Sequence, residues 1–132
     1  MAFVMLNPSV ADAEADDPTI RRCIGFARSW GFGGLVAVNL FAWRDTHPSG
    51  MKRAADPVGP EGDAPILEAA RLASLTVAAW GVHGAHLGRG SQVAALLRAA
   101  GPLHHLGLTK DGHPRHPLYL RGDARPERWR DA

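Results

Sequence analysis

Short apolar runs alternate with segments of helical periodicity along the chain. The apolar runs cover residues 2–6, 35–41, 75–80 and 103–108, and their length and composition are typical of strands buried on both faces. Strands that alternate with helices predict a mainly parallel sheet with helices on both sides. The expected fold class is therefore α/β, with three layers (α/β/α) and a short, mainly parallel sheet of four strands.

Three helices are predicted from their start and stop signals. Asp16-Asp17-Pro18 places acidic N-cap residues before a proline at the first helical position, and Gly31 ends this helix. Asp63 is expected to cap a helix over residues 63–72, and Ser91 to cap another over residues 91–100. The segments that remain between these elements are expected to be loops: residues 42–62, 82–90 and 109–117.

The chain has the length of one domain, with 132 residues. We expect a single α/β domain over residues 2–120 and a charged tail over residues 121–132, which is frayed or forms a short terminal helix. A core strand at the very start of the chain predicts either that this strand begins the fold or that an upstream segment has been lost.

Composition excludes several classes of protein. The 15 Lys and Arg residues against 13 Asp and Glu give a net charge of +2, which permits contact with phosphates without requiring it. Cys23 is the single cysteine, so an internal disulfide and a CxxC metal site are excluded within one chain. The sequence has neither an apolar run of about 18 residues nor a secretory leader, so we expect no membrane span and a cytoplasmic location.

Polar and aromatic residues follow each predicted strand. In an open parallel sheet, ligands bind outside the carboxyl ends of the strands, so these residues are expected to meet at one edge. In chain order they are Asn7, Pro8, Ser9 and Asp12; Asn39, Trp43, Arg44, Asp45 and His47; Trp80, Gly81, His83 and His86; and Thr109, Lys110, Asp111, His113, Arg115 and His116.

Asn39 interrupts an otherwise apolar strand, and two interpretations of it remain open. Its amide offers donors and an acceptor that match the edge of a pyrimidine or a similar base. Alternatively, the side chain ties down the adjacent loop. The same choice applies to Asn7-Pro8, which is either part of a site or a strand-ending turn, and to Trp80, which either stacks on a base or packs in the core.

Two pairs of histidines have the spacing i, i+3: His83 with His86, and His113 with His116. Neither pair has a third ligand at a clear spacing, so we expect no metal ion. No cofactor is expected either.

The strand-end motifs resemble, in chain order, those of the uracil-DNA glycosylase superfamily. That superfamily has an Asn- or Asp-Pro motif after its first strand, a base-reading asparagine on its second, Trp-Gly at the end of its third and His-Pro after its fourth. The matching segments here are Leu6-Asn7-Pro8-Ser9, Leu35-Val36-Ala37-Val38-Asn39, Ala79-Trp80-Gly81 and His116-Pro117-Leu118. The glycosylase motif His-Pro-Ser-Pro-Leu is replaced by His-Pro-Arg-His-Pro-Leu over residues 113–118, and we align His116 with its histidine.

More closely, the chain resembles an uncharacterised bacterial domain family. Its members carry LNPS-x-AD, DDPTIRR, NLFA-x-R, DPVGP, AWG and T-K-x-G-x-P-x-HPLYL, and all these motifs occur here across residues 3–120. Members of that family usually have further residues before the first strand. The resemblance therefore implies that this chain lacks an N-terminal segment.

The superfamily resemblance implies a role for each matching residue. Asn7 would position or activate water, and backbone groups near Pro8 and Ser9 would help to bind the ribose or phosphate. Asn39 would read the edge of the base. His116 would stabilise the negative charge that develops on the base oxygen when the glycosidic bond breaks.

The expected activity is therefore that of an N-glycosidase that acts on a base in DNA or in a nucleotide. We expect Arg44, Trp80, Gly81 and Lys110 to complete the substrate-binding residues. Two alternatives remain open. One is a non-catalytic module that binds nucleic acid or nucleotide with the same edge, and the other is a different hydrolase or a metal enzyme that uses the histidines.

Overall fold

Strand β1 (Ala2–Met5) lies inside the sheet, because all four of its residues are apolar and all four are buried. The computed structural model describes residues 1–8 and 17–130 of the chain. β1 pairs in parallel with β2 (Val36–Asn39) on one side and with β3 (Thr76–Ala78) on the other. β4 (His104–His105) continues the parallel sheet beside β3, and β5 (Glu127–Arg128) adds to it in the antiparallel direction.

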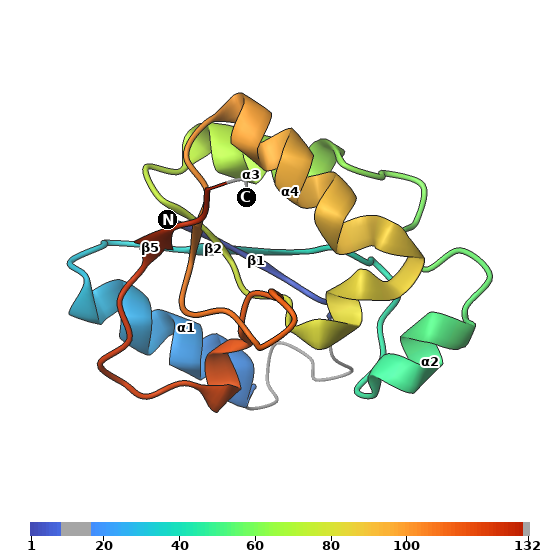
Figure 1. Ribbon diagram of the computed structural model, residues 1–132, viewed down its shortest axis with the longest axis horizontal. Coiled ribbons are helices and arrows are strands. Elements are labelled where there is room, and N and C mark those ends of the chain that lie inside the picture. The colour runs from blue at the N-terminus through green and yellow to red at the C-terminus, as the bar shows by residue number, and fades with distance from the viewer. Residues whose placement is uncertain (9–16, 131–132) are drawn as a thin grey trace.

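Helices cover both faces of this sheet, as predicted (Figure 1). Helix α1 (Pro18–Ser29) packs on one face, whereas α3 (Ala64–Leu72) and α4 (Arg89–Ala100) pack on the other. The predicted start of α1 is confirmed, since the Asp17 carboxylate accepts hydrogen bonds from the backbone N–H groups of Thr19 and Ile20, at 2.9 and 3.3 Å. These bonds pair two of the amides that a helix leaves open at its N-terminus.

The sheet residues divide between two hydrophobic clusters by the alternation of a strand. Val4, Val38 and Trp80 belong to the cluster under α3 and α4. Phe3, Met5 and their neighbours belong to the cluster under α1, together with Cys23. Cys23 is fully buried and unpaired, and burial, reinforced by Asp17, raises the pKa of its thiol to about 12.

The prediction of four strands is wrong, because the described residues form a sheet of five in the order β2-β1-β3-β4-β5. The extra strand comes from the segment predicted to fray or to form a helix. Trp129, just after β5, packs against Trp80 and His105, with ring centroids 5.8 and 6.1 Å apart, and donates its backbone N–H to Leu103. These contacts are distant in sequence, so a charged composition did not reveal them.

β2 also differs from its prediction as a buried strand. It is an edge strand of the sheet, and Val36 is half exposed. β1 and the central residues of β3 are buried as predicted.

Two short helices lie in segments predicted as loops: α2 (Pro48–Arg53) and η1 (Val82–Gly88). A third, η2 (Pro117–Tyr119), begins at the last residue of the loop predicted over residues 109–117. Helix α4 begins at Arg89 rather than at Ser91, and no side chain caps it. Asp63 occupies the predicted N-cap position of α3 without making a capping bond. Its carboxylate pairs instead with the buried guanidinium of Arg89, which also donates to the carbonyl of Leu40 at 2.9 Å. Within residues 1–8 and 17–130, no helix is long and apolar enough to cross a membrane.

Candidate functional site

A cavity of about 630 Å³ opens where the carboxyl ends of β1, β2 and β3 meet the start of α1. This volume lies within the range of roughly 300–1,000 Å³ that is typical of small-molecule sites. Its position agrees with the rule that ligands bind outside the carboxyl ends of parallel strands. The residues that line it are Met5, Leu6, Asn7, Pro8, Asp17, Thr19, Ile20, Ala37, Asn39, Arg44, Asp45, Thr46, Pro48, Trp80, Gly81, Val82, His83, Thr109, Arg115, His116, Leu118 and Tyr119.

Asn7 fastens the loop that follows β2. Its Nδ2 donates to the backbone carbonyls of Pro8, Trp43 and Asp45, at 3.3, 3.1 and 3.0 Å. Three carbonyl oxygens around one atom fix the orientation of the carboxamide, since only an N–H group satisfies them. Oδ1 accepts no hydrogen bond from the described residues, so it is the polar atom of Asn7 that is left for a ligand or a water in the cavity.

Asn39 ends β2, where it pairs in register with Met5. Its neighbours Val38 and Leu40 turn toward the core under α3 and α4, which places Asn39 on the opposite face, beside Ala37 and the cavity. Its side chain is partly exposed and makes no hydrogen bond with the described residues. Of the two interpretations left open for Asn39, the tie to the adjacent loop is therefore not made, whereas Asn7 makes such ties.

His116 approaches the same cavity from the segment between β4 and η2. Its Nδ1 accepts the backbone N–H of Leu118 at 3.2 Å, which assigns the proton of the neutral ring to Nε2. Burial lowers the pKa of His116 from its ordinary value of 6.5, and the nearby charge of Asp17 opposes this shift. The ring is therefore a neutral hydrogen-bond donor near pH 7.

Gly81 allows this approach. Its φ is 75°, a conformation that L side chains rarely adopt, and it donates its N–H to Pro114 at 2.8 Å. A Cβ at this position would lie 3.6 Å from the Cβ of His116. The Trp80-Gly81 motif thus holds the segment that carries His116 close to the end of β3.

The remaining predicted site residues divide between the cavity and other places. Pro8 and Arg44 line the cavity. Trp80 borders it too, but only 2% of Trp80 is exposed and its indole packs among core residues, so the core interpretation holds for the ring. Lys110 is exposed in a turn and does not line the cavity. Ser9 lies outside the described residues.

Asp17 was predicted as a helix cap and not as a residue of the site, but it lines the cavity. A helix that follows a parallel strand begins at the carboxyl edge of the sheet, so this signal was present in the sequence. Thr19 and Tyr119 were also missed, and Tyr119 is 80% exposed. Together with Asp45, Asp17 supplies the carboxylates of the lining, which also contains Arg44 and Arg115.

In the part of the chain that the structure describes, no group of three or more His, Cys, Asp or Glu side chains is placed to hold a metal ion. The cavity's polar groups are amides, imidazoles, hydroxyls and charged side chains of both signs. Such groups suit a polar ligand that has both donors and acceptors of hydrogen bonds.

The fold and the site define an α/β protein with a polar cavity at the carboxyl edge of a mostly parallel sheet. Residues 1–118 match the model of a family described as "Protein of unknown function (DUF1643)", and the chain belongs to that family. The searches among curated proteins and among solved structures gave no match.

Proposed function

We propose that this protein is a cytoplasmic enzyme like the uracil-DNA glycosylases, which cleaves the N-glycosidic bond of a base in DNA or in a nucleotide. One observation carries the proposal: Asn7, Asn39 and His116, which are far apart in the sequence, line the same cavity. Asn7 follows β1, Asn39 ends β2 and His116 follows β4, in the order that the glycosylase resemblance implies.

Each of these groups has a chemical role in that reaction. The carboxamide of Asn39 has donors and an acceptor for the edge of the base. When the bond between the sugar carbon and the base nitrogen breaks, its electron pair moves onto the base. Nε2–H of His116 donates to the base oxygen that gains the negative charge.

Water completes the reaction by adding to the sugar carbon, while its proton passes to the leaving base or to solvent. Asn7 Oδ1 is an acceptor that orients this water, because Nδ2 is committed to three carbonyls. An amide cannot take up the proton, so Asn7 is a positioning residue and not a general base.

The rim of the cavity supports a nucleic-acid substrate. Leu118 and Tyr119 border it and are 46% and 80% exposed. An exposed aromatic side chain beside a pocket stacks well on a base, and the arginines Arg44 and Arg115 line the same cavity.

An assay for abasic sites tests the proposal. The whole chain is incubated with oligonucleotides that carry uracil or other modified bases, and strand breaks are scored after alkali treatment. We expect breaks at one modified base, and a loss of at least about 100-fold in rate in Asn39→Ala and His116→Ala. Arg28→Gln, at the far end of α1, is the control with full activity. Breaks that persist in both cavity variants, or no breaks on any substrate, would contradict the proposal.

Asn7 favours a second candidate, a non-catalytic module that binds nucleic acid or a nucleotide. Its amide acts first as a structural tie, and no carboxylate occupies its position. This candidate predicts salt-dependent binding of the same oligonucleotides, lost in Asn39→Ala, without any abasic product.

A further inference from the structure

Lys52 and His83 meet at the rim of the cavity from distant parts of the chain. Nζ of Lys52, on α2, lies 2.9 Å from Nδ1 of His83, on η1. His83 lines the cavity, as do Pro48 at the start of α2 and Val82 next to His83. The ammonium group is therefore held at the cavity by a side chain of its wall.

The partner of this lysine is an imidazole rather than a carboxylate. Lys52 makes no ion pair with an acidic side chain in the described part of the chain. A carboxylate would cancel the charge of the ammonium, whereas a neutral imidazole fixes its position and leaves the charge in place. Burial and the charge of Lys52 lower the pKa of His83, so the ring stays neutral and accepts at Nδ1.

The pair presents several hydrogen-bond donors at one point. An ammonium has three N–H donors, of which one is used by Nδ1 of His83. The neutral ring carries its proton on Nε2, which is a further donor. Uncompensated positive charge with several donors is the arrangement that binds a phosphate group.

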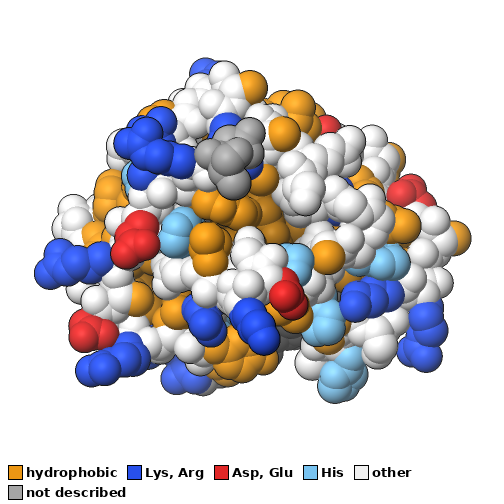
Figure 2. Space-filling view, in the orientation of Figure 1, with side chains coloured by type: hydrophobic (Ala, Val, Ile, Leu, Met, Phe, Trp, Pro, Cys, Tyr) orange, Lys and Arg blue, Asp and Glu red, His pale blue; other side chains and the backbone are white. Residues whose placement is uncertain are grey.

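The surroundings extend this positive rim. Histidine, lysine and arginine side chains gather at the lower right of the molecule, over the region of α2 and η1 (Figure 2). Arg44 lines the cavity just before α2, and Arg53 is exposed at the end of that helix. The Asp45 carboxylate, which also borders the cavity, accepts the backbone N–H of His47 at 3.0 Å.

We propose that Lys52 and His83 form a phosphate-binding subsite at the rim of the cavity, next to the place where Asn39 reads the base. This inference rests on the proposed function, because in nucleotides and in DNA a phosphate lies one sugar away from each base. The phosphate comes either from the backbone of a polynucleotide or from the 5′ position of a free nucleotide. His83 is a positioning residue for the ammonium as well as a donor.

Binding measurements test the subsite. The probe is a fluorescein-labelled single-stranded oligodeoxynucleotide that contains uracil, titrated with wild type, Lys52→Gln, His83→Ala and the control Arg28→Gln. Arg28 is exposed and lies nine residues along α1 from Thr19, about 14 Å from the cavity end of that helix. The substitution Arg28→Gln therefore removes one positive charge at a position distant from the proposed subsite.

We expect Lys52→Gln to weaken oligonucleotide binding about 5- to 10-fold at low salt and to reduce the slope of log K against log salt by about one. His83→Ala weakens binding about 2- to 5-fold, since the ammonium loses its support. Arg28→Gln leaves affinity and slope unchanged. Equal effects of Lys52→Gln and Arg28→Gln would overturn the subsite, as would no effect of Lys52→Gln.

Small ligands identify the source of the phosphate. Deoxyuridine and deoxyuridine 5′-monophosphate are compared as competitors. A preference for the monophosphate that disappears in Lys52→Gln assigns the subsite to the 5′-phosphate of a nucleotide. Equal competition by both, with weaker oligonucleotide binding in Lys52→Gln, assigns it to the backbone of a polynucleotide.

The outcome for the subsite is separable from that for the N-glycosidase. If abasic product forms equally well in wild type and Lys52→Gln and binding is unchanged, the phosphate subsite is contradicted and the N-glycosidase is supported. If Lys52→Gln binds more weakly and no protein yields abasic product, the phosphate subsite is supported and the N-glycosidase is contradicted. Absence of binding by the oligonucleotide and by the monophosphate to wild type overturns both.

Discussion

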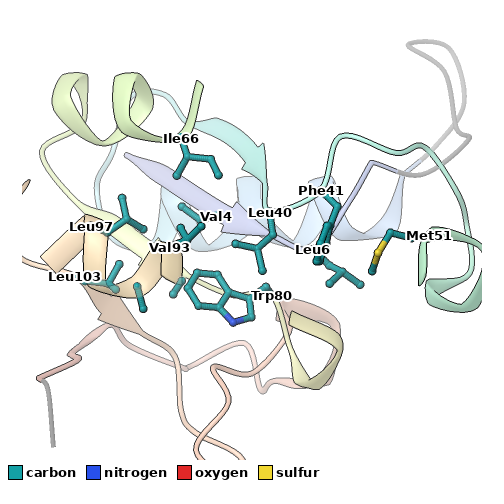
Figure 3. Packing of buried hydrophobic residues seen from close by; sticks show 12 residues of the cluster. Val4, Leu6, Leu40, Phe41, Met51, Ile66, Trp80, Val93, Leu97 and Leu103 are labelled. Atoms are coloured by element: carbon teal, nitrogen blue, oxygen red, sulfur yellow. The ribbon is translucent and has the colours of Figure 1, made fainter. Parts of the chain in front are cut away.

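The two faces of the sheet are built by the same strands, yet one face is filled and the other opens into the cavity. On the side of α3 and α4, Val4, Leu40 and Trp80 pack in one cluster of buried side chains with Ile66 and Leu97 (Figure 3). On the side of α1, a second cluster of buried side chains includes Phe3, Cys23 and Phe26. Beyond Met5, toward the carboxyl ends of the strands, that side borders the cavity.

Residues 38–40 show how one strand serves both faces. Val38 and Leu40 enter the filled side, and Asn39 between them lines the cavity. A polar residue in an apolar strand is costly when it is buried without a partner. It is tolerated here because its side of the sheet is open, so the interruption in the sequence marks the site and not a defect of the core.

The largest expected effect is that of truncation on the filled face. Leu40 is 1% exposed, and Leu40→Ala leaves a cavity among close-packed side chains. We expect a loss of about 2–5 kcal/mol in the free energy of unfolding, measured by urea denaturation. A loss below about 1 kcal/mol would mean that this face is not closely packed, and the contrast with the cavity side would fail.

Asn7 joins the two regions, and its variants have the next largest effect. Asn7→Ala removes three hydrogen bonds to the carbonyls of Pro8, Trp43 and Asp45, with an expected cost of about 1–3 kcal/mol. Asn7→Asp is expected to cost at least as much near pH 7, since a carboxylate would face three carbonyl oxygens without an N–H to offer. Amide hydrogen exchange in residues 43–47 should rise in both variants.

This expectation also explains why an asparagine rather than an aspartate suits position 7. A stability of Asn7→Asp equal to or above that of the wild type would contradict it. The loop tie would then contribute nothing, and Asn7 would belong to the cavity alone.

Acid is expected to lower the stability of the fold through histidines at the cavity and on β4. Burial lowers the pKa values of His83 and His116 near the cavity, and of His104 and His105 on β4, from the ordinary 6.5. The unfolded chain therefore binds protons at a higher pH than the folded chain does, so the free energy of unfolding is highest above pH 6.5. It falls as the pH is lowered from 6.5 through the lowered pKa values of these histidines.

Urea midpoints between about pH 7.5 and pH 5 at constant ionic strength measure this dependence. His116→Gln should make the urea midpoint depend less on pH by removing a histidine at the cavity, and His105→Gln by removing one on β4. A midpoint that rises on acidification would show that these histidines gain more from nearby carboxylates, such as Glu127 beside His105, than they lose by burial.

The elements that the sequence predicts correctly are those whose structure is decided by local chemistry. Asp17-Pro18 starts α1 because the carboxylate and the proline act within one turn of the chain. The parallel order of β1 to β4 follows from the alternation of strands and helices. That alternation also explains why Asn7, Asn39 and His116 meet, since parallel strands deliver their following residues to one edge.

The failures have a tertiary cause. β5 has only two residues, Glu127 and Arg128, and exists because Trp129 packs beside Trp80. Asp63 could not be foreseen as the partner of Arg89, 26 residues away, because a helix cap was its local role. The contact between Lys52 and His83 likewise depends on how α2 and η1 pack in the folded chain.

The smallest expected change in stability, at Asn39, tests the comparison most sharply. Its side chain makes no hydrogen bond with the described residues and borders open space, so Asn39→Ala should shift the free energy of unfolding by no more than about 0.5 kcal/mol. Leu40→Ala, one residue further, is the matched control with the large loss. If Asn39→Ala instead lowers the free energy of unfolding by more than about 1 kcal/mol, the amide of Asn39 stabilises the fold and is not available to bind a ligand. A neutral effect on stability combined with loss of oligonucleotide binding would assign the two neighbours to different tasks, one to packing and one to recognition.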